Sequence, residues 1–214
     1  MSNFRDAFID FALRHEALGF GQFTLKSGRL SPYFFNSGRF NTGAALAELG
    51  RFYAAAIDAA GIEFDMLFGP AYKGIPLAAS VAIALAADGR DVPYCFNRKE
   101  AKDHGEGGLT LGAPLRGRVL IIDDVISAGT SVNQSVELIH AANATPAGVA
   151  ISLDRQEKGA GELSAVQEVQ QHHGLAVTSI AGLNDLLRYV EARPEMQAPL
   201  AEIAAYLARY GVST

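Results

Sequence analysis

The stretch 119–131 constrains the fold of this chain most strongly. It begins with four consecutive aliphatic residues, a run that would expose apolar surface on both faces of a solvated strand. Such a run is typical of a strand buried in the middle of a parallel sheet. The adjacent acids Asp123 and Asp124 follow it, and the small and hydroxyl residues 127–131 come next. The backbone N–H groups of such a turn, placed before a helix, can bind an anion.

Acids at the end of a strand, directly before an anion-binding turn, suit a ligand that carries both hydroxyl groups and a phosphate, such as a ribose phosphate. The stretch lacks the lysine of a Walker nucleotide loop and the glycine spacing of a dinucleotide-binding turn. An alternative is an acidic turn that only caps a helix. Two acids beside a fully apolar strand are costly to place without a function, so we favour the ribose phosphate site.

The remaining pattern predicts an α/β fold with a parallel, doubly wound sheet flanked by helices, because apolar strands alternate with segments of helical periodicity. We expect strands at 66–69, 94–96, 119–122, 148–153 and 176–180. The segment 19–38 alternates aromatic and polar residues and predicts a small β-rich hood outside this sheet. The length of 214 residues suits a single domain, 1–214, with a hood subregion of about 1–40 plus the C-terminal helices.

Capping residues mark several helix ends. Ser2 or Asn3 can cap a first helix, and Ser164 with Gln167 has the spacing of a capping box. An alanine-rich segment closes near Gly61. These signals place helices between the predicted strands, as an alternating fold requires.

Charged or polar pairs follow four successive strands. The carboxyl ends of parallel strands meet at one edge of a sheet, where ligands bind. Each pair alone could belong to an ordinary solvated loop. Because the fold brings these ends to one crevice, we predict a single site that contains the pairs Tyr72–Lys73, Arg98–Lys99, Asp123–Asp124 and Asp154–Arg155.

The segment 98–112 is rich in glycine and charge and has no apolar periodicity. We predict a long loop there, either functional or disordered. Acidic and basic residues balance over 98–108, so its cations cannot form a diffuse basic patch. They must act by position, as a mobile lid that closes over an anion. A disordered, solvated loop is the alternative.

Charge and composition exclude several classes of partner. The formal net charge is −5, which argues against a protein that holds nucleic acid through its overall field. The single Cys95 rules out an internal disulfide, and the N-terminus has no apolar signal core. No apolar run approaches membrane-spanning length. We expect a cytoplasmic protein without nucleic-acid or membrane partners.

The same residues carry a family resemblance. The apolar run followed by Asp-Asp-Val-Ile-Ser-Ala-Gly-Thr at 123–130 resembles the phosphoribosyl pyrophosphate (PRPP) motif of the type I phosphoribosyltransferases. Over nearly its whole length the chain is similar to the orotate phosphoribosyltransferases of that family. The resemblance implies the type I phosphoribosyltransferase fold. It also implies Mg²⁺-dependent transfer of the 5-phosphoribosyl group from PRPP to orotate, giving orotidine 5′-monophosphate and pyrophosphate in de novo pyrimidine (UMP) biosynthesis.

The resemblance implies roles residue by residue. The catalytic residues would be Asp123, Asp124, Lys102 and Lys26. PRPP would be bound by Lys26, Tyr72, Lys73, Arg98, Lys99, Lys102, His104, Asp123, Asp124, Val125, Ile126, Ser127, Ala128, Gly129, Thr130 and Ser131. Orotate would be bound by Phe34, Phe35, Ser127 and Arg155. The planar fork of an arginine suits the carboxylate that distinguishes orotate from uracil.

Further features follow from the resemblance. Mg²⁺ would be held through PRPP and water, with no direct protein ligand. The enzyme would be a homodimer whose sites are shared between subunits, with lid cations reaching the neighbouring site. The loop after the strand 66–69 would hold a cis peptide at Ala71–Tyr72.

Some alternatives stay open. Ser127 stands where many family members have Thr, although the hydroxyl is kept. On sequence alone, Phe34 and Phe35 suit a core pair as well as a ligand platform. A phosphoribosyltransferase for another base is the nearest alternative function. A regulator that keeps the PRPP site as a sensor is another, but the chain has no recognisable nucleic-acid-binding element.

Overall fold

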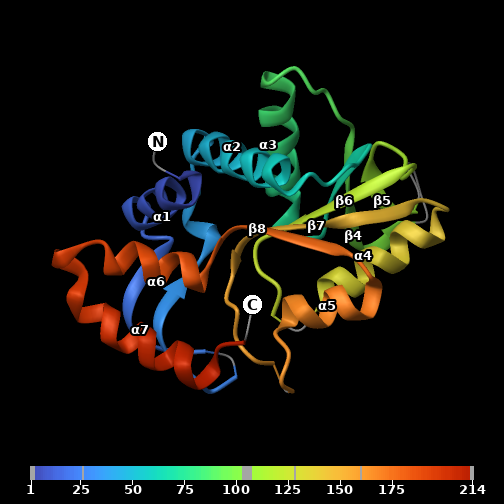
Figure 1. The fold of residues 1–214 in the computed structure, drawn as a ribbon. Coiled ribbons are helices and arrows are strands. Elements are labelled where there is room, and N and C mark those ends of the chain that lie inside the picture. Colours follow the sequence, from blue (N-terminus) through green and yellow to red (C-terminus); the bar gives the residue numbers. More distant parts are fainter. Residues whose placement is uncertain (1–2, 26, 103–107, 128, 160, 213–214) are drawn as a thin grey trace.

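The computed structural model describes residues 3–25, 27–102, 108–127, 129–159 and 161–212, and of residues 99–102, 108 and 197 the backbone alone. Within these ranges the main sheet has six strands in the order β5-β4-β3-β6-β7-β8. Figure 1 shows this sheet edge-on between layers of helices. Its strands are β3 (Met66–Gly69), β4 (Tyr94–Lys102), β5 (Gly108–Gly112), β6 (Arg118–Asp123), β7 (Thr145–Asp154) and β8 (Ala176–Gly182).

The sheet is mixed. β4, β3, β6, β7 and β8 are parallel to their neighbours, as predicted, whereas β5 pairs antiparallel with β4. The prediction of one long loop over 98–112 is therefore wrong, because β4 runs on to Lys102 and β5 begins at Gly108. A hairpin ladder is held by backbone hydrogen bonds, which need no apolar alternation in the sequence. The predicted tip of the lid, 103–107, lies outside the described residues.

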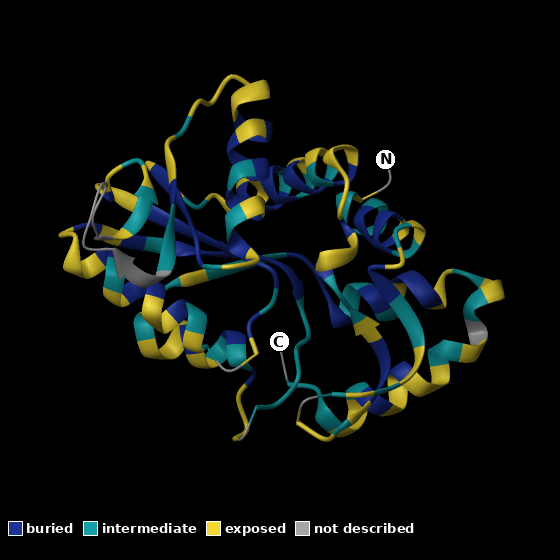
Figure 2. Ribbon diagram, turned by 180° about the vertical axis from the view of Figure 1, so that it is seen from behind, coloured by how far each residue is buried: buried dark blue, intermediate teal, exposed yellow. Residues whose placement is uncertain are grey.

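Helices cover both faces of the main sheet. α2 (Gly43–Ala60) and α3 (Gly74–Ala87) lie on one face, and α4 (Thr130–Ala141) and α5 (Ala165–His173) lie on the other (Figure 1). Successive side chains of β6 alternate between the two cores, Leu120 and Ile122 with α2 and α3, Val119 and Ile121 with α4 and α5. The run is apolar throughout because both faces are covered, and the central strands are dark blue in Figure 2.

The predicted β-rich hood is a separate antiparallel hairpin beside the main sheet. It consists of β1 (Leu18–Thr24) and β2 (Leu30–Phe35). The helices α1 (Phe4–Arg14), α6 (Leu183–Glu191) and α7 (Gln197–Tyr210) gather around it (Figure 1). The predicted caps are confirmed: Asn3 caps α1, and Ser164 and Gln167 form the capping box of α5.

The order of the strands reverses between β3 and β6. From β3 the chain continues outward to β4 and β5, and from β6 it continues in the opposite direction to β7 and β8. In open α/β sheets, ligands bind at the carboxyl edge where this reversal occurs. The loop after β3 carries Lys73, and β6 ends at Asp123. The fold therefore places the predicted acids at the position where a ligand is expected.

Candidate functional site

Two buried carboxylates stand at the end of β6. Asp123 and Asp124 are each 7% exposed. Asp123 accepts hydrogen bonds from the backbone N–H of Asp124 (2.9 Å) and the hydroxyl of Ser131 (2.8 Å). Asp124 Oδ1 accepts from the backbone N–H of Val125 at 2.9 Å. The hydroxyl of Tyr53 donates to the backbone carbonyl of Asp123 at 2.6 Å, so the strand end is fixed from the side of α2.

The other oxygen of Asp124 joins two further segments. Lys73 Nζ, from the turn after β3, lies 2.6 Å from Asp124 Oδ2. The hydroxyl of Ser37, in the short helix η1 (Ser37–Arg39) after the hood, donates to the same oxygen at 2.9 Å. No sequence pattern pointed to Ser37, because it stands 87 positions from Asp124. The lysine side chain is 55% exposed and is therefore accessible to solvent.

The loop between β3 and α3 packs tightly against its surroundings. The predicted cis peptide at Ala71–Tyr72 is confirmed. A Cβ atom on Gly69 would lie 2.2 Å from the carbonyl oxygen of Gly74, so only glycine fits there. The amide side chain of Asn97 accepts a hydrogen bond from the N–H of Ala71 at 2.6 Å. β4 thus holds this loop at the carboxyl edge of the sheet, where Tyr72 is 66% exposed.

The turn after Asp124 leads into the N-terminus of α4. Gly129, the N-cap, has φ 69°, a left-handed conformation that favours glycine. As a glycine, this N-cap offers no side-chain acceptor to the first N–H groups of the helix. Ser127 and Thr130 are exposed at the turn. Unpaired amides at the positive end of a helix dipole form an anion site.

Arg155 lies after β7 and faces the hood. Its Nη2 is 2.6 Å from Glu157 Oε1 and 3.1 Å from the hydroxyl of Ser31. The guanidinium also lies over the ring of Tyr33, 4.4 Å from its centroid. The arginine is therefore placed between the strand end and the hood, and its main partner, Glu157, had no role in the sequence prediction.

The two hood phenylalanines point to opposite sides of β2. Phe35 is half-buried and packs near Phe8, with ring centroids 6.3 Å apart. Phe34 is 43% exposed and stacks on Phe23 at 5.5 Å. The core interpretation therefore holds for Phe35, whereas Phe34 faces outward. Contact of either ring with orotate stays a prediction.

Several predicted site residues have no described side chain. Lys26, His104 and Ala128 lie outside the described residues, and Lys99 and Lys102 belong to β4 by their backbone alone. Arg98 lies half-buried in β4. Among the residues that the structure describes, no group of three or more His, Cys, Asp or Glu side chains could hold a metal ion. No described helix is long and apolar enough to cross a membrane.

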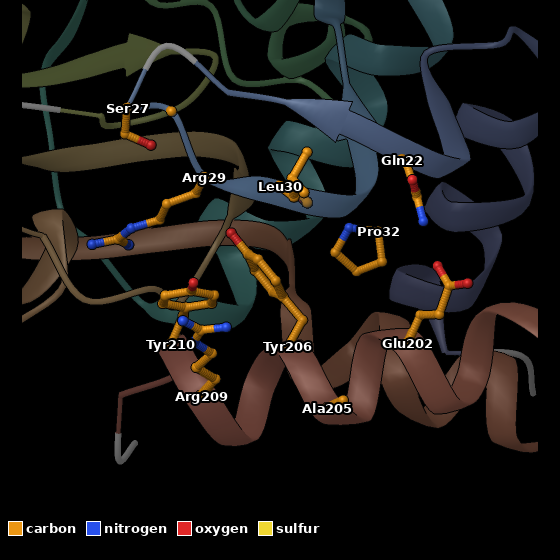
Figure 3. A pocket seen from close by; sticks show the side chains of 12 residues that line it. Gln22, Ser27, Arg29, Leu30, Pro32, Glu202, Ala205, Tyr206, Arg209 and Tyr210 are labelled. Carbon is orange, nitrogen blue, oxygen red and sulfur yellow. The ribbon is translucent and has the colours of Figure 1, made fainter.

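A cavity of about 700 Å³ lies between the hood and α7. Figure 3 shows Arg29 and Leu30 on its hood side and Tyr206, Arg209 and Tyr210 on its helix side. Neither carboxylate of β6 lines it. The ribose phosphate site predicted at the end of β6 is therefore not this cavity.

Burial raises the pKa of Asp123 to about 6, and the negative charge of Asp124 adds to this effect. The hydroxyl of Ser131 and the ammonium of Lys73 act in the opposite direction. The charged form of Asp123 is therefore costly in the folded protein without a ligand.

Asp123→Asn is expected to stabilise the folded protein near neutral pH. The folded-state pKa of about 6 exceeds the ordinary value of 3.8 for an aspartate, so the folded protein binds the extra proton and the free energy of unfolding falls as the pH rises through this window. The loss amounts to about 3 kcal/mol, which asparagine avoids. Urea denaturation should show the variant more stable at pH 7.5, with a gap that closes near pH 4.

Asp65→Asn is a matched control, for which the expected change in stability has the opposite sign. Hydrogen bonds from Arg118 lower the pKa of the exposed Asp65 to about 2. Its charged form is favoured on folding, so Asp65→Asn should destabilise the protein above pH 4 rather than stabilise it. An equal gap between Asp123→Asn and the unaltered protein at both pH values would contradict the raised pKa.

One family model matches a large part of this chain. Residues 38–178 match the model of the phosphoribosyl transferase domain. The matched segment begins at the short helix that contributes Ser37 and extends into β8. It includes both carboxylates, the lysine loop and the amide turn.

Full-length relatives share most of their sequence with this chain. The chain is 65% identical over 212 residues to the orotate phosphoribosyltransferase of Chromobacterium violaceum, with 99% of each protein covered. It is 62% identical over 213 residues to that of Cellvibrio japonicus, again with 99% of each covered. Because the alignments span the entire hood and both C-terminal helices, the likeness is not confined to the PRPP motif.

Solved structures agree. The orotate phosphoribosyltransferase of Francisella tularensis superposes with a TM-score of 0.88 and 42% identity, covering 96% of this chain and 99% of that one. The Mycobacterium tuberculosis orotate phosphoribosyltransferase in complex with PRPP gives a TM-score of 0.63 at 24% identity, covering 86% of this chain and 98% of that one. The second likeness shows the fold alone.

Proposed function

The chain belongs to the phosphoribosyl transferase family and, within it, to the orotate phosphoribosyltransferases, and from this membership we propose how its residues carry the reaction. The enzyme transfers the 5-phosphoribosyl group from PRPP to orotate, giving orotidine 5′-monophosphate and pyrophosphate. The observation that carries the assignment of roles is the meeting of Asp124, Lys73 and the N-terminus of α4 at the strand reversal.

We assign the 5-phosphate to the turn 125–131. The amides at the start of α4 and the exposed hydroxyls of Ser127 and Thr130 are suitable donors. A phosphate there would place the ribose beside the end of β6. The carboxylates of Asp123 and Asp124 would then accept hydrogen bonds from the ribose hydroxyls.

Displacement at the anomeric carbon develops positive charge on the ribose ring. Two fixed carboxylates in a largely water-excluded position stabilise such charge, and they need little reorganisation because their partners already hold them. Catalysis is thus electrostatic and positional.

The leaving pyrophosphate would be received by cations around the crevice. Lys73 is one described candidate, and its ammonium already contacts Asp124. Ribose hydroxyls that bond to the acid would displace this ammonium toward the pyrophosphate. The other proposed donors are Tyr72, Lys26, Arg98, Lys99, Lys102 and His104.

Mg²⁺ is proposed as the cofactor. The carboxylate and hydroxyl oxygens at the end of β6 are donors that a hard cation prefers, and in this proposal PRPP and water would hold the ion. When bound, it supplies positive charge to the pyrophosphate oxygens.

We further propose a homodimer with sites shared between subunits, working in the cytoplasm. The balanced charge of the lid segment supports cations that act by position, on either their own or a neighbouring site.

Relatives named for orotate over their full length favour this base over another, and they favour an enzyme over a sensor. Loss of orotate absorbance on mixing the protein with PRPP and Mg²⁺ tests the assignment. Turnover of uracil or hypoxanthine in place of orotate would overturn it.

Arg155 is proposed to bind the orotate carboxylate. Arg155→Ala, combined with Glu157→Gln so that no unpaired carboxylate stays buried, should weaken orotate binding. The loss of a charged hydrogen bond costs about 1.5–3 kcal/mol, roughly a 10- to 100-fold rise in the KM for orotate. The KM for PRPP should change less than about twofold. Equal losses for both substrates would show that Arg155 does not act on the base.

A further inference from the structure

A largely buried carboxylate that the reaction does not use lies beside Arg155. The side chain of Glu157 is 10% exposed, and that of Arg155 is 20% exposed. A carboxylate at such a depth is costly unless it is paired and hydrogen-bonded. Glu157 Oε1 meets both conditions, since it lies 2.6 Å from Arg155 Nη2 and accepts the hydroxyl of Tyr33 at 3.0 Å.

This carboxylate belongs to a set of contacts that fixes the guanidinium from three sides. The ring of Tyr33 lies beneath its plane, with the centroid 4.4 Å from Cζ. The hydroxyl of the buried Ser31 accepts from Nη2 at 3.1 Å. The contacts to Glu157 and Ser31 both involve Nη2, and the hydroxyl of Tyr206 also interacts with the arginine.

The backbone between the two charged residues sets this geometry. Gln156 has φ 50°, a left-handed conformation rare for residues other than glycine. It turns the chain so that the side chains of Arg155 and Glu157 meet. Three hydrogen bonds hold it there: its N–H donates to Asp154 Oδ1 at 2.9 Å, its carbonyl accepts from the N–H of Val212 at 3.0 Å, and its side chain accepts from the N–H of Asn184 at 2.8 Å.

The hood and α7 brace the next residues of the same segment. Arg29 donates to the carbonyl oxygens of Lys158 (2.6 Å) and Gly159 (3.0 Å), and its guanidinium lies 5.0 Å from the ring centroid of Tyr210. Figure 3 shows Arg29 and Tyr210 facing each other at the edge of the cavity. The N–H of Lys158 donates to the carbonyl of Tyr210 at 2.8 Å. The segment is thus held from two directions before any ligand binds.

We propose that Glu157, together with the hydroxyl of Tyr33, is a positioning residue that presents the Arg155 guanidinium to the orotate carboxylate. The proposal rests on the assignment of Arg155 to the base. An arginine that is already oriented loses little rotamer freedom when the ligand binds, and this raises affinity for the carboxylate. In this proposal Glu157 acts through the arginine and does not touch the reacting atoms.

Glu157→Gln removes the negative charge that pairs with Arg155. Tyr33→Phe removes the hydroxyl that donates to Glu157 and keeps the ring under the guanidinium. We expect the KM for orotate to rise about 10-fold in Glu157→Gln and about threefold in Tyr33→Phe. The kcat and the KM for PRPP should stay within about twofold of the unaltered enzyme. A general loss of structure would lower kcat and affect both substrates, so the split between the two KM values identifies positioning.

Two control variants remove similar groups elsewhere. Glu162→Gln removes an exposed carboxylate that pairs with Lys158, and Tyr189→Phe removes a tyrosine hydroxyl that donates to Asp10. Neither should change the KM for orotate. If Glu157→Gln fails to fold, Tyr33→Phe tests the positioning role by the same comparison of the KM for orotate with the KM for PRPP.

The outcomes separate this proposal from the assignment on which it rests. If the KM for orotate is unchanged or lowered in both Glu157→Gln and Tyr33→Phe, the positioning role is overturned. If the orotate KM also stays unchanged in the double variant that lacks Arg155, the assignment of the arginine to the base fails instead. If the KM for orotate rises in the double variant but is unchanged in Glu157→Gln and in Tyr33→Phe, the positioning role is overturned and the assignment of Arg155 to the base stands.

Discussion

Asp124→Asn is expected to lower kcat about 100- to 1000-fold, the loss seen when one preorganised electrostatic group is removed from an active site. The variant keeps the size of the side chain and the acceptor for the N–H of Val125. It removes the negative charge that opposes the cation developing on the ribose. It also releases the ammonium of Lys73, which now pairs with Asp124 at 2.6 Å. The released lysine can bind pyrophosphate oxygens, so affinity for PRPP should hold or increase.

Steady-state kinetics and calorimetric titration with PRPP together check this expectation. Ser37→Ala is the matched control, because it removes a neutral donor from the same carboxylate oxygen and leaves the charge in place. Its kcat should fall far less than that of Asp124→Asn. A loss of PRPP affinity as large as the loss of kcat would show that Asp124 binds the substrate without favouring the transition state.

Activity should reappear when two inactive variants are combined, if lid cations of one subunit act on the acids of its partner. Asp124→Asn damages the strand-end site, and Lys102→Ala damages the lid. A mixed dimer then has one site with both lesions and one with neither. Equal amounts, dissociated and re-associated at random, should recover about a quarter of the original activity, since about half of the dimers are mixed and each has one intact site.

Asp124→Asn mixed with Asp123→Asn provides the control, because both lesions lie at the end of β6. Every site in that mixture carries a lesion, so no activity should return. Mass spectrometry would establish that mixed dimers have formed. If mixed dimers of Asp124→Asn and Lys102→Ala form but their activity stays at the level of the two separate variants, the lid acts on the site of its own subunit.

Much of the fold followed from local patterns. The apolar run before Asp123 predicted a buried strand, and β6 is buried between two helical layers because each face meets one of them. Capping residues predicted the starts of α1 and α5. The hairpin of β4 and β5 escaped prediction, since backbone pairing at a sheet edge leaves no apolar period in the sequence.

The sequence by itself determined which residues stand at the ends of the strands, because hydrophobic runs and small-residue turns are local features. It also predicted that parallel strands would bring those ends together. Only the tertiary structure decided which side chains meet: Lys73 and Ser37 at Asp124, and Glu157 at Arg155. These contacts depend on strand order, on one left-handed residue and on the packing of the hood. Such properties arise from the whole chain, so no local sequence pattern predicts them.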